Sequence, residues 1–197
     1  MEFQDVVRKR KMVRSFTDGP IDPAVLGRIL ANAQRAPSAG FSQGWAFLVL
    51  EGREETERYW SITMSPERRA EFGWPGLFRA PVLILCLSHK QAYLDRYAEP
   101  DKGWTDRDET RWPVPYWDID TGMAGLLILQ TAVDAGLGAL FFGAQHQGAL
   151  HTAFGIPDAY TVVGTIAIGH PAEVDRPSPS LARGRRPAAL VVHRGRW

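Results

Sequence analysis

The segment Pro81–Leu87 (PVLILCL) constrains the fold of this 197-residue chain more than any other. It is apolar at every position, whereas a strand with one solvated face alternates apolar and polar residues. The sequence therefore predicts a strand that is buried on both faces.

Shorter patterns predict further elements around this strand. Strand character is found in Trp45–Leu50, Ala139–Phe142 and Thr161–Ile168, and Ala188–His193 is a candidate for a last strand. Helices are expected near Val6, after Asp22-Pro23, from Glu54, and over Asp118–Ala135 and His146–Phe154. Because helices and strands do not alternate strictly, an α+β sandwich fits this order better than a doubly wound fold. We expect a single domain over residues 1–197.

Composition excludes several classes of protein. With 45% hydrophobic and 23% charged residues, the chain can build a core and does not resemble a disordered protein. The single cysteine, Cys86, excludes an intramolecular disulfide, and the five scattered histidines give no metal-ligand spacing. The apolar stretch Met123–Leu129 is far shorter than the ~20 residues that span a bilayer, and residues 1–20 show no secretory signal. We expect a cytoplasmic protein with no metal and no membrane contact.

Positive charge is concentrated at both ends of the chain. Residues 1–14 contain five Lys or Arg against two acidic residues, and residues 175–197 contain six Arg against one Asp. Because the whole chain carries only +1, the residues between these ends are acidic, and a nucleic-acid binder is not indicated. The two basic ends suggest convergence on one bound anion, and solvated surface charge is the alternative interpretation.

Residues 99–117 show no periodicity and contain three of the seven tryptophans. A loop of this length in a compact domain is usually functional or disordered, and its aromatic residues argue against disorder. We interpret it either as a lid over a substrate compartment or as a structural strap. A basic arm is expected from about residue 176.

Two motifs near the N-terminus resemble a known family. Arg10–Phe16 (RKMVRSF) is followed about twenty residues later by Ala36–Trp45 (APSAGFSQGW). The pair resembles the opening of the FMN-dependent nitroreductases, whose patterns are roughly R-x-S-x-R-x-F and A-P-S-x-x-N-x-Q-P-W. Later matches are Gly136–Ala139, Phe142-Gly143, Phe154–Pro157, Ile168–Pro171 and Arg183–Pro187 followed by Val191–His193. The resemblance implies a three-layer α-β-α sandwich with a mixed, mainly antiparallel sheet, in an intertwined homodimer with FMN at the interface.

The resemblance also implies which residues hold the FMN phosphate. Arg10, Arg183 and Arg185 would bind the phosphate itself, which would explain why both ends of the chain are basic. Lys11 and Met12 would approach the ribityl-phosphate chain.

The flavin ring would be held by three further segments. Arg14 would lie beside flavin N1 and the C2 carbonyl, where a cation favours reduction because negative charge develops at that edge. Backbone groups at the end of the predicted strand Ala139–Phe142 would approach flavin N5, and a loop of the second subunit would complete the site. The residues are Leu140, Phe142 and Gly143 for the strand end and Pro37, Ser38 and Ala39 for the loop.

The chain departs from the family pattern at several positions. Met12 stands where Ser is usual, Phe41 where Asn is usual and Gly44 where Pro is usual. Residues Phe72–Phe78 contain no Asn or Lys of the kind that many members place against the flavin pyrimidine. FMN affinity and substrate choice are therefore expected to differ from those of typical members.

The resemblance implies an oxidoreductase that passes hydride from NAD(P)H through FMN to a nitroaromatic, quinone or similar electron-poor ring. A non-catalytic flavin-binding or flavin-sequestering protein is the alternative. Nothing in the sequence distinguishes NADH from NADPH or from a deazaflavin reductant. Flat aromatic walls would favour planar acceptors by stacking, and the candidate substrate-binding residues are Phe41, Trp104, Trp112 and Tyr116.

Overall fold

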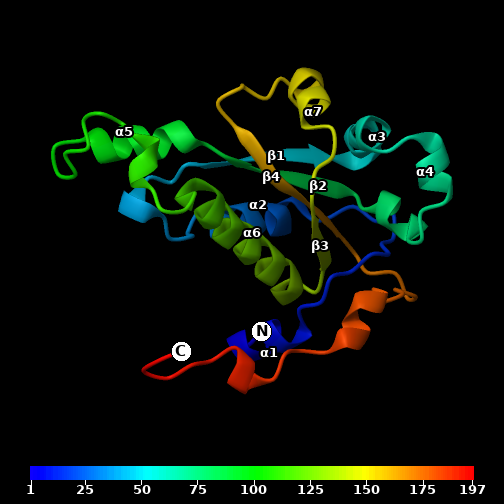
Figure 1. The fold of residues 1–197 in the computed structure, drawn as a ribbon. Helices are drawn as coiled ribbons and strands as arrows, with labels where there is room; N and C mark the ends of the chain where they lie inside the picture. Colours follow the sequence, from blue (N-terminus) through cyan, green and yellow to red (C-terminus); the bar gives the residue numbers. More distant parts are fainter.

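The computed structural model describes all 197 residues as seven α-helices, four strands and five short 3-10 turns, which are labelled η (Figure 1). In chain order the elements are α1 (Phe3–Lys9), α2 (Pro23–Ala33), η1 (Ala39–Phe41), β1 (Trp45–Glu51), α3 (Gly52–Thr63), α4 (Pro66–Ala70), η2 (Pro75–Arg79), β2 (Val82–Ser88), α5 (Lys90–Ala98), η3 (Glu109–Arg111), α6 (Tyr116–Asp134), β3 (Gly138–Phe142), α7 (Gln147–Phe154), β4 (Thr161–Gly169), η4 (Pro179–Arg183) and η5 (Ala188–Leu190).

The four strands form one sheet in the order β1-β2-β4-β3, and every neighbouring pair is antiparallel. Strand β2 lies inside the sheet, with Phe47 of β1 opposite Cys86 and Thr165 of β4 opposite Leu85. All seven residues of β2 are buried. The prediction of a strand buried on both faces is confirmed.

Helices cover both faces of the sheet. Successive side chains of a strand point to opposite faces, so β2 contributes to two separate apolar clusters. Ile84 packs in the cluster with α2 and α6, whereas Leu83 and Leu85 pack in the cluster with α3 and α7. The resulting α-β-α sandwich confirms the expected fold class.

The N-terminal segment that follows α1 runs along the edge of β3. Met12 forms a parallel bridge with Ala139, and the backbone N–H of Val13 donates to the Ala139 carbonyl at 3.0 Å. Phe16 forms an antiparallel bridge with Pro171, just beyond β4. These contacts place the basic residues of the N-terminus beside β3.

The expected last strand at Ala188–His193 is wrong. Ala188–Leu190 form the 3-10 turn η5, and all residues from Pro179 onward are exposed. Residues 177–197 hydrogen-bond only among themselves, so no edge of this chain's sheet pairs with them. In the view of Figure 1 the arm and helix α1 are both drawn at the lower side of the molecule.

Two helices were not predicted from the sequence. Helix α4 begins at Ser65-Pro66, where the Ser65 hydroxyl accepts from Arg68 N–H, and α5 buries only Tyr93 and Leu94. One short helix and one helix with few apolar residues give little periodic signal. None of the seven α-helices combines the length and the apolar character that a membrane span requires.

Candidate functional site

A cavity of about 390 Å³ lies beside the C-terminal end of β3, between that strand end and the α3–η2 region. Its volume falls within the range of small-molecule and cofactor sites, roughly 300–1,000 Å³. The lining residues are Arg14, Tyr59, Trp60, Thr63, Met64, Arg68, Phe72, Trp74, Leu77, Leu140, Phe141, Phe142, Gly143 and Gln145. Four of them, Arg14, Leu140, Phe142 and Gly143, were predicted to contact the flavin ring.

Arg14 is held at this cavity by its backbone and its side chain. Its backbone N–H donates to Asp175 Oδ1 at 2.8 Å, and its guanidinium donates to the Met12 carbonyl at 2.9 Å. The guanidinium carbon also lies 5.5 Å from the ring centroid of Trp74, within reach of a cation–π contact. Arg14 is therefore fixed from three sides.

Two guanidinium groups lie near the Trp74 ring. Arg176, at the start of the C-terminal arm, lies 5.4 Å from the same ring centroid, and its carbonyl accepts from Trp74 Nε1 at 2.9 Å. Arg176 also donates to the Gly73 carbonyl at 3.1 Å. The first residue of the arm, Arg176, therefore holds Trp74, which lines the cavity, in place.

Part of the cavity wall is formed by aromatic residues of α3 and β3. Trp60 is 2% exposed and stacks on Phe142, with ring centroids 5.6 Å apart and planes 12° apart. Tyr59 packs edge-on against Trp60, and burial raises the pKa of its hydroxyl to about 12. Trp60 Nε1 has no hydrogen-bond partner. Since no carboxylate lines the cavity and Tyr59 stays neutral, its charged lining residues are the cations Arg14 and Arg68.

Asp175 is a site residue that the sequence reasoning missed. Its side chain is only 7% exposed, its Oδ1 accepts from Arg14 N–H, and its Oδ2 lies 3.4 Å from Lys11 Nζ. A single acidic residue at the start of a basic arm gives no motif. Only the folded chain shows that it faces the N-terminal basic segment.

Met12 contributes to the core as well as to the basic segment. Its side chain is half-buried and packs against both apolar clusters. Its carbonyl accepts from the Arg14 guanidinium. The position where Ser is usual is therefore occupied by a packing residue.

The predicted phosphate-binding residues Arg10, Arg183 and Arg185 have no hydrogen bond or ion pair to their side chains. No hydrogen bond or ion pair links Arg10 to Arg183 or Arg185, and their convergence on one phosphate stays a prediction. Three unpaired guanidinium groups suit a phosphate, which arginine binds in a bidentate manner.

The loop Pro37–Phe41 lies away from this cavity, between α5 and the first turns of α6. The Ala39 N–H donates to Asp120 Oδ2 at 2.9 Å, and Ser38 Oγ accepts from Gln43 N–H at 3.0 Å. None of the residues 37–41 lines the cavity of Arg14. Phe41 is 73% exposed. Within one chain, the two halves of the predicted flavin site are separate.

The aromatic residues of the 99–117 loop pack on helix α5 of their own chain. Trp112 has ring centroids 4.5 Å from Tyr97 and 5.9 Å from Tyr93, and Trp104 lies 4.9 Å from Tyr97. Tyr116 lies 5.7 Å from Trp112. This packing favours the interpretation as a strap.

The cavity and the basic residues fit an FMN molecule in chemical type. An isoalloxazine ring is flat and largely apolar with one polar edge, and the cavity offers aromatic walls with a cation at its rim. The unpaired arginines offer the charge that a phosphate requires. No group of His, Cys, Asp and Glu side chains that could hold a metal ion is present.

Comparisons with known proteins agree with this architecture. A model of the nitroreductase family matches residues 7–170. A protein of Archaeoglobus fulgidus with the provisional name NADH dehydrogenase/NAD(P)H nitroreductase is 24% identical over 174 residues, covering 86% of each chain. A Thermus thermophilus protein named NADH dehydrogenase is 25% identical over 199 residues, covering 92% of each.

A solved structure of a nitroreductase family protein from Clostridium novyi NT has the same fold. It superposes with a TM-score of 0.68 at 25% identity and covers 88% of this chain and 87% of its own. A nitroreductase family protein from Streptococcus pneumoniae TIGR4 reaches a TM-score of 0.74 at 19% identity, covering 98% and 100%.

Proposed function

This chain belongs to the nitroreductase family, and on that premise we propose that it is an FMN-dependent oxidoreductase. It would pass hydride from NAD(P)H to a nitroaromatic, a quinone or a similar electron-poor ring. The observation that carries the proposal is the cavity that joins Arg14 to the end of β3 through aromatic walls. The names of the Archaeoglobus and Thermus relatives support the use of a nicotinamide donor.

When bound, FMN supplies a two-electron carrier that the side chains of this protein lack. Arg14 would place a fixed positive charge where negative charge develops on reduction, and preorganised charge of this kind is a large catalytic term. The apolar wall formed by Trp60 and Phe142 would exclude water and strengthen this interaction. The backbone of Leu140, Phe142 and Gly143 would border the reacting edge.

The phosphate would be held by Arg10, Arg183 and Arg185, with Lys11 beside the ribityl-phosphate chain. Support comes from the unpaired state of the three guanidinium groups. Lys11 differs from them, because its ammonium is already paired with Asp175 at 3.4 Å.

The functional unit would be a homodimer, in which Pro37, Ser38 and Ala39 complete the site of the second copy. Helix α6 supports this proposal, because Ile119, Met123 and Leu126 are 38–45% exposed on it. The C-terminal arm supports it as well. Five large apolar side chains along that arm are more than half exposed: Leu181, Leu190, Val191, Val192 and Trp197.

Phe41 would contact the acceptor from that same loop. Phe41→Asn is expected to lower kcat/KM several-fold for planar aromatic acceptors and to leave FMN affinity nearly unchanged, because one good aromatic pair contributes about 0.5–1.5 kcal/mol. Steady-state kinetics with small and bulky quinones would measure this. Equal losses on all acceptors would remove Phe41 from substrate binding.

The test of the proposal is an absorption spectrum of the purified protein, with and without FMN, followed by anaerobic addition of NADH or NADPH. We expect a bound flavin whose visible band bleaches, and a dimer by light scattering at micromolar concentration. Bound flavin that neither nucleotide reduces would favour the flavin-sequestering alternative or a deazaflavin reductant. A protein that takes up no flavin would end both.

A further inference from the structure

The loop from Ser38 to Gly44 has an unusual backbone. Phe41 and Gln43 have positive φ angles of 57° and 50°, and Gly40 between Ala39 and Phe41 has one of 61°. Positive φ is uncommon for residues other than glycine, and such strain persists only where the surroundings enforce it. The contacts that enforce it here are on two sides of the loop.

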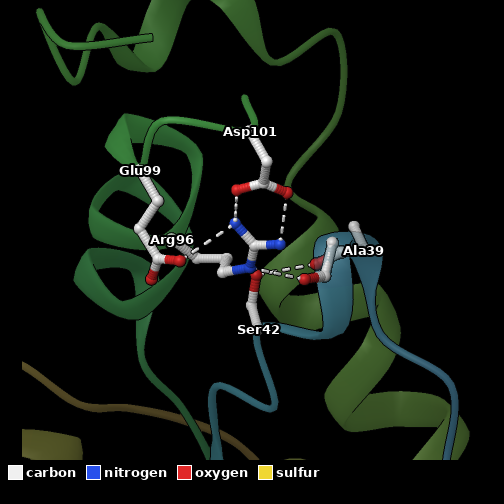
Figure 2. A network of polar contacts seen from close by, with 6 residues as sticks. Ala39, Ser42, Arg96, Glu99 and Asp101 are labelled. Carbon is white, nitrogen blue, oxygen red and sulfur yellow. Dashed lines mark hydrogen bonds and ion pairs between the residues drawn. The ribbon is translucent and has the colours of Figure 1, made fainter. Parts of the chain in front are cut away.

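Arg96 of α5 holds the first side (Figure 2). Its Nε donates to the Gly40 carbonyl at 2.8 Å. Its two terminal nitrogens each donate to one carboxylate oxygen of Asp101 at 2.7 Å, and one of them also donates to Glu99 at 3.2 Å. The bidentate pair fixes the plane of the guanidinium, and therefore the direction of the Nε–H bond. Arg96 is thus a rigid donor to the loop.

Asp120 of α6 holds the second side. It is 2% exposed, and its Oδ2 accepts from the Ala39 N–H at 2.9 Å and from the Tyr93 hydroxyl at 2.8 Å. No cation pairs with it. Burial, and secondly the bond to Asp120, raise the pKa of Tyr93 far above its usual range, so that hydroxyl remains a donor.

Two glycines of the loop, Gly40 and Gly44, lie so close to α5 that neither position has space for a side chain. A Cβ at Gly40 would lie 2.6 Å from the Tyr97 ring, and one at Gly44 would lie 2.5 Å from the Tyr93 ring. The loop backbone is therefore pressed against α5. A strained backbone, a buried carboxyl group that accepts two hydrogen bonds, and close packing together describe a segment that is held in shape before anything binds to it.

We propose that Arg96 and Asp120 are positioning residues that fix loop 38–43 so that it completes the cofactor site of a second copy of the chain. The inference rests on the proposed function, in which this loop serves the partner's flavin. A preorganised loop loses little conformational entropy on binding, which preserves affinity. Without the two supports, the loop would have to be ordered when the flavin binds.

The first experiment compares Arg96→Ala with Arg107→Ala. Arg107 is the matched control. It forms an ion pair at 2.7 Å with Asp95, which lies on α5 as Arg96 does, and it makes no hydrogen bond to loop 38–43. FMN affinity is measured by quenching of flavin fluorescence, and stability by thermal melting. We expect Arg96→Ala to weaken FMN binding about 10-fold with a melting shift no larger than that of Arg107→Ala.

Equal FMN affinities for the two variants would overturn the role of Arg96. Asp120→Ala with Tyr93→Phe as its control repeats the comparison on the buried side. The Tyr93→Phe variant keeps the Ala39–Asp120 bond, whereas Asp120→Ala removes it, so we expect FMN affinity to fall several-fold more in Asp120→Ala. If wild type itself binds no FMN, the proposed function fails, which is a different result from wild type that binds and variants that match it.

A mixed dimer tests whether Arg96 acts on the partner's site. Subunits carrying Arg10→Ala and Arg96→Ala are co-expressed with different tags, and the heterodimer is purified through both. If the loop serves the second copy, both defects fall in one site and the other site is intact, so the heterodimer binds one FMN tightly. If the loop serves its own chain, each site carries one defect and no tight site is found, which would overturn the inference.

Discussion

Replacing Trp112 with alanine separates the two interpretations of the 99–117 loop. Trp112 is the centre of an aromatic cluster on α5. Its ring lies within 6.1 Å, centroid to centroid, of five others: Tyr93, Tyr97, Trp104, Tyr116 and Trp117. If the loop is a structural strap, truncation of Trp112 should lower the stability of the protein. If the loop is a lid, the same truncation should change the selectivity among acceptors.

The size of the stability loss follows from this packing. Truncation of a large aromatic residue in a core costs about 3–5 kcal/mol. Trp112 is half-buried and its Nε1 has no hydrogen-bond partner, so the expected loss is smaller. We expect about 2–3 kcal/mol, which corresponds to a fall in Tm of roughly 4–12 °C for a chain of this size.

Thermal melting at a fixed protein concentration measures this change, because Tm of an oligomer depends on concentration. Trp112→Phe is the control. It keeps an aromatic ring and removes the unpartnered N–H, so we expect it to lose much less stability than Trp112→Ala. A Tm within about 2 °C of wild type for Trp112→Ala, together with a selective fall in kcat/KM for bulky acceptors, would refute the strap.

Three further predictions concern the charged residues. Arg14→Ala should lower the two-electron potential of bound flavin and slow its reduction, measured by anaerobic titration with reference dyes; an unchanged potential would remove Arg14 from the flavin edge. Arg10→Ala and Arg185→Ala should each weaken FMN binding by about 1.5–3 kcal/mol in calorimetry, and a variant that binds like wild type would show that its arginine does not contact the phosphate. Asp175→Asn should raise the flavin potential, because it removes a negative charge 3.4 Å from Lys11 Nζ and next to the Arg14 backbone; a lowered potential would mean that the carboxylate mainly holds Arg14 in place.

The layered fold was predictable because local patterns determine it. The apolar run of β2 requires cover on both faces, and the side chains of that strand divide between two clusters as strand periodicity requires. Helix α2 begins where Asp22-Pro23 predicts, with Asp22 Oδ1 accepting from Ala24 N–H at 2.7 Å. The C-terminal strand could not be judged in this way, since Ala188–His193 has strand-like residues but no strand of its own chain to pair with.

The supporting residues of the site could not be predicted because their contacts join distant parts of the chain. Asp175 meets Arg14 across 161 positions of sequence, and Asp120 meets Ala39 across 81. Isolated carboxylates carry no motif, and their role depends on which backbone N–H the fold brings to them. The residues predicted to contact the flavin could be named only from motifs that resemble the family pattern. Arg14, for example, was named because it lies within the motif Arg10–Phe16.

One departure from the family pattern, Gly44, is explained by the residues that surround it in the structure. Gly44 stands where Pro is usual, and a Cβ there would lie 2.5 Å from the Tyr93 ring and 2.9 Å from the His89 carbonyl oxygen. Tyr93 occupies that space because its hydroxyl donates to Asp120, and Asp120 in turn holds the Ala39 N–H. Gly44 is therefore a requirement of the Tyr93–Asp120 contact: a proline at this position would displace Tyr93, and Asp120, which holds the Ala39 N–H, would lose one of its two hydrogen bonds.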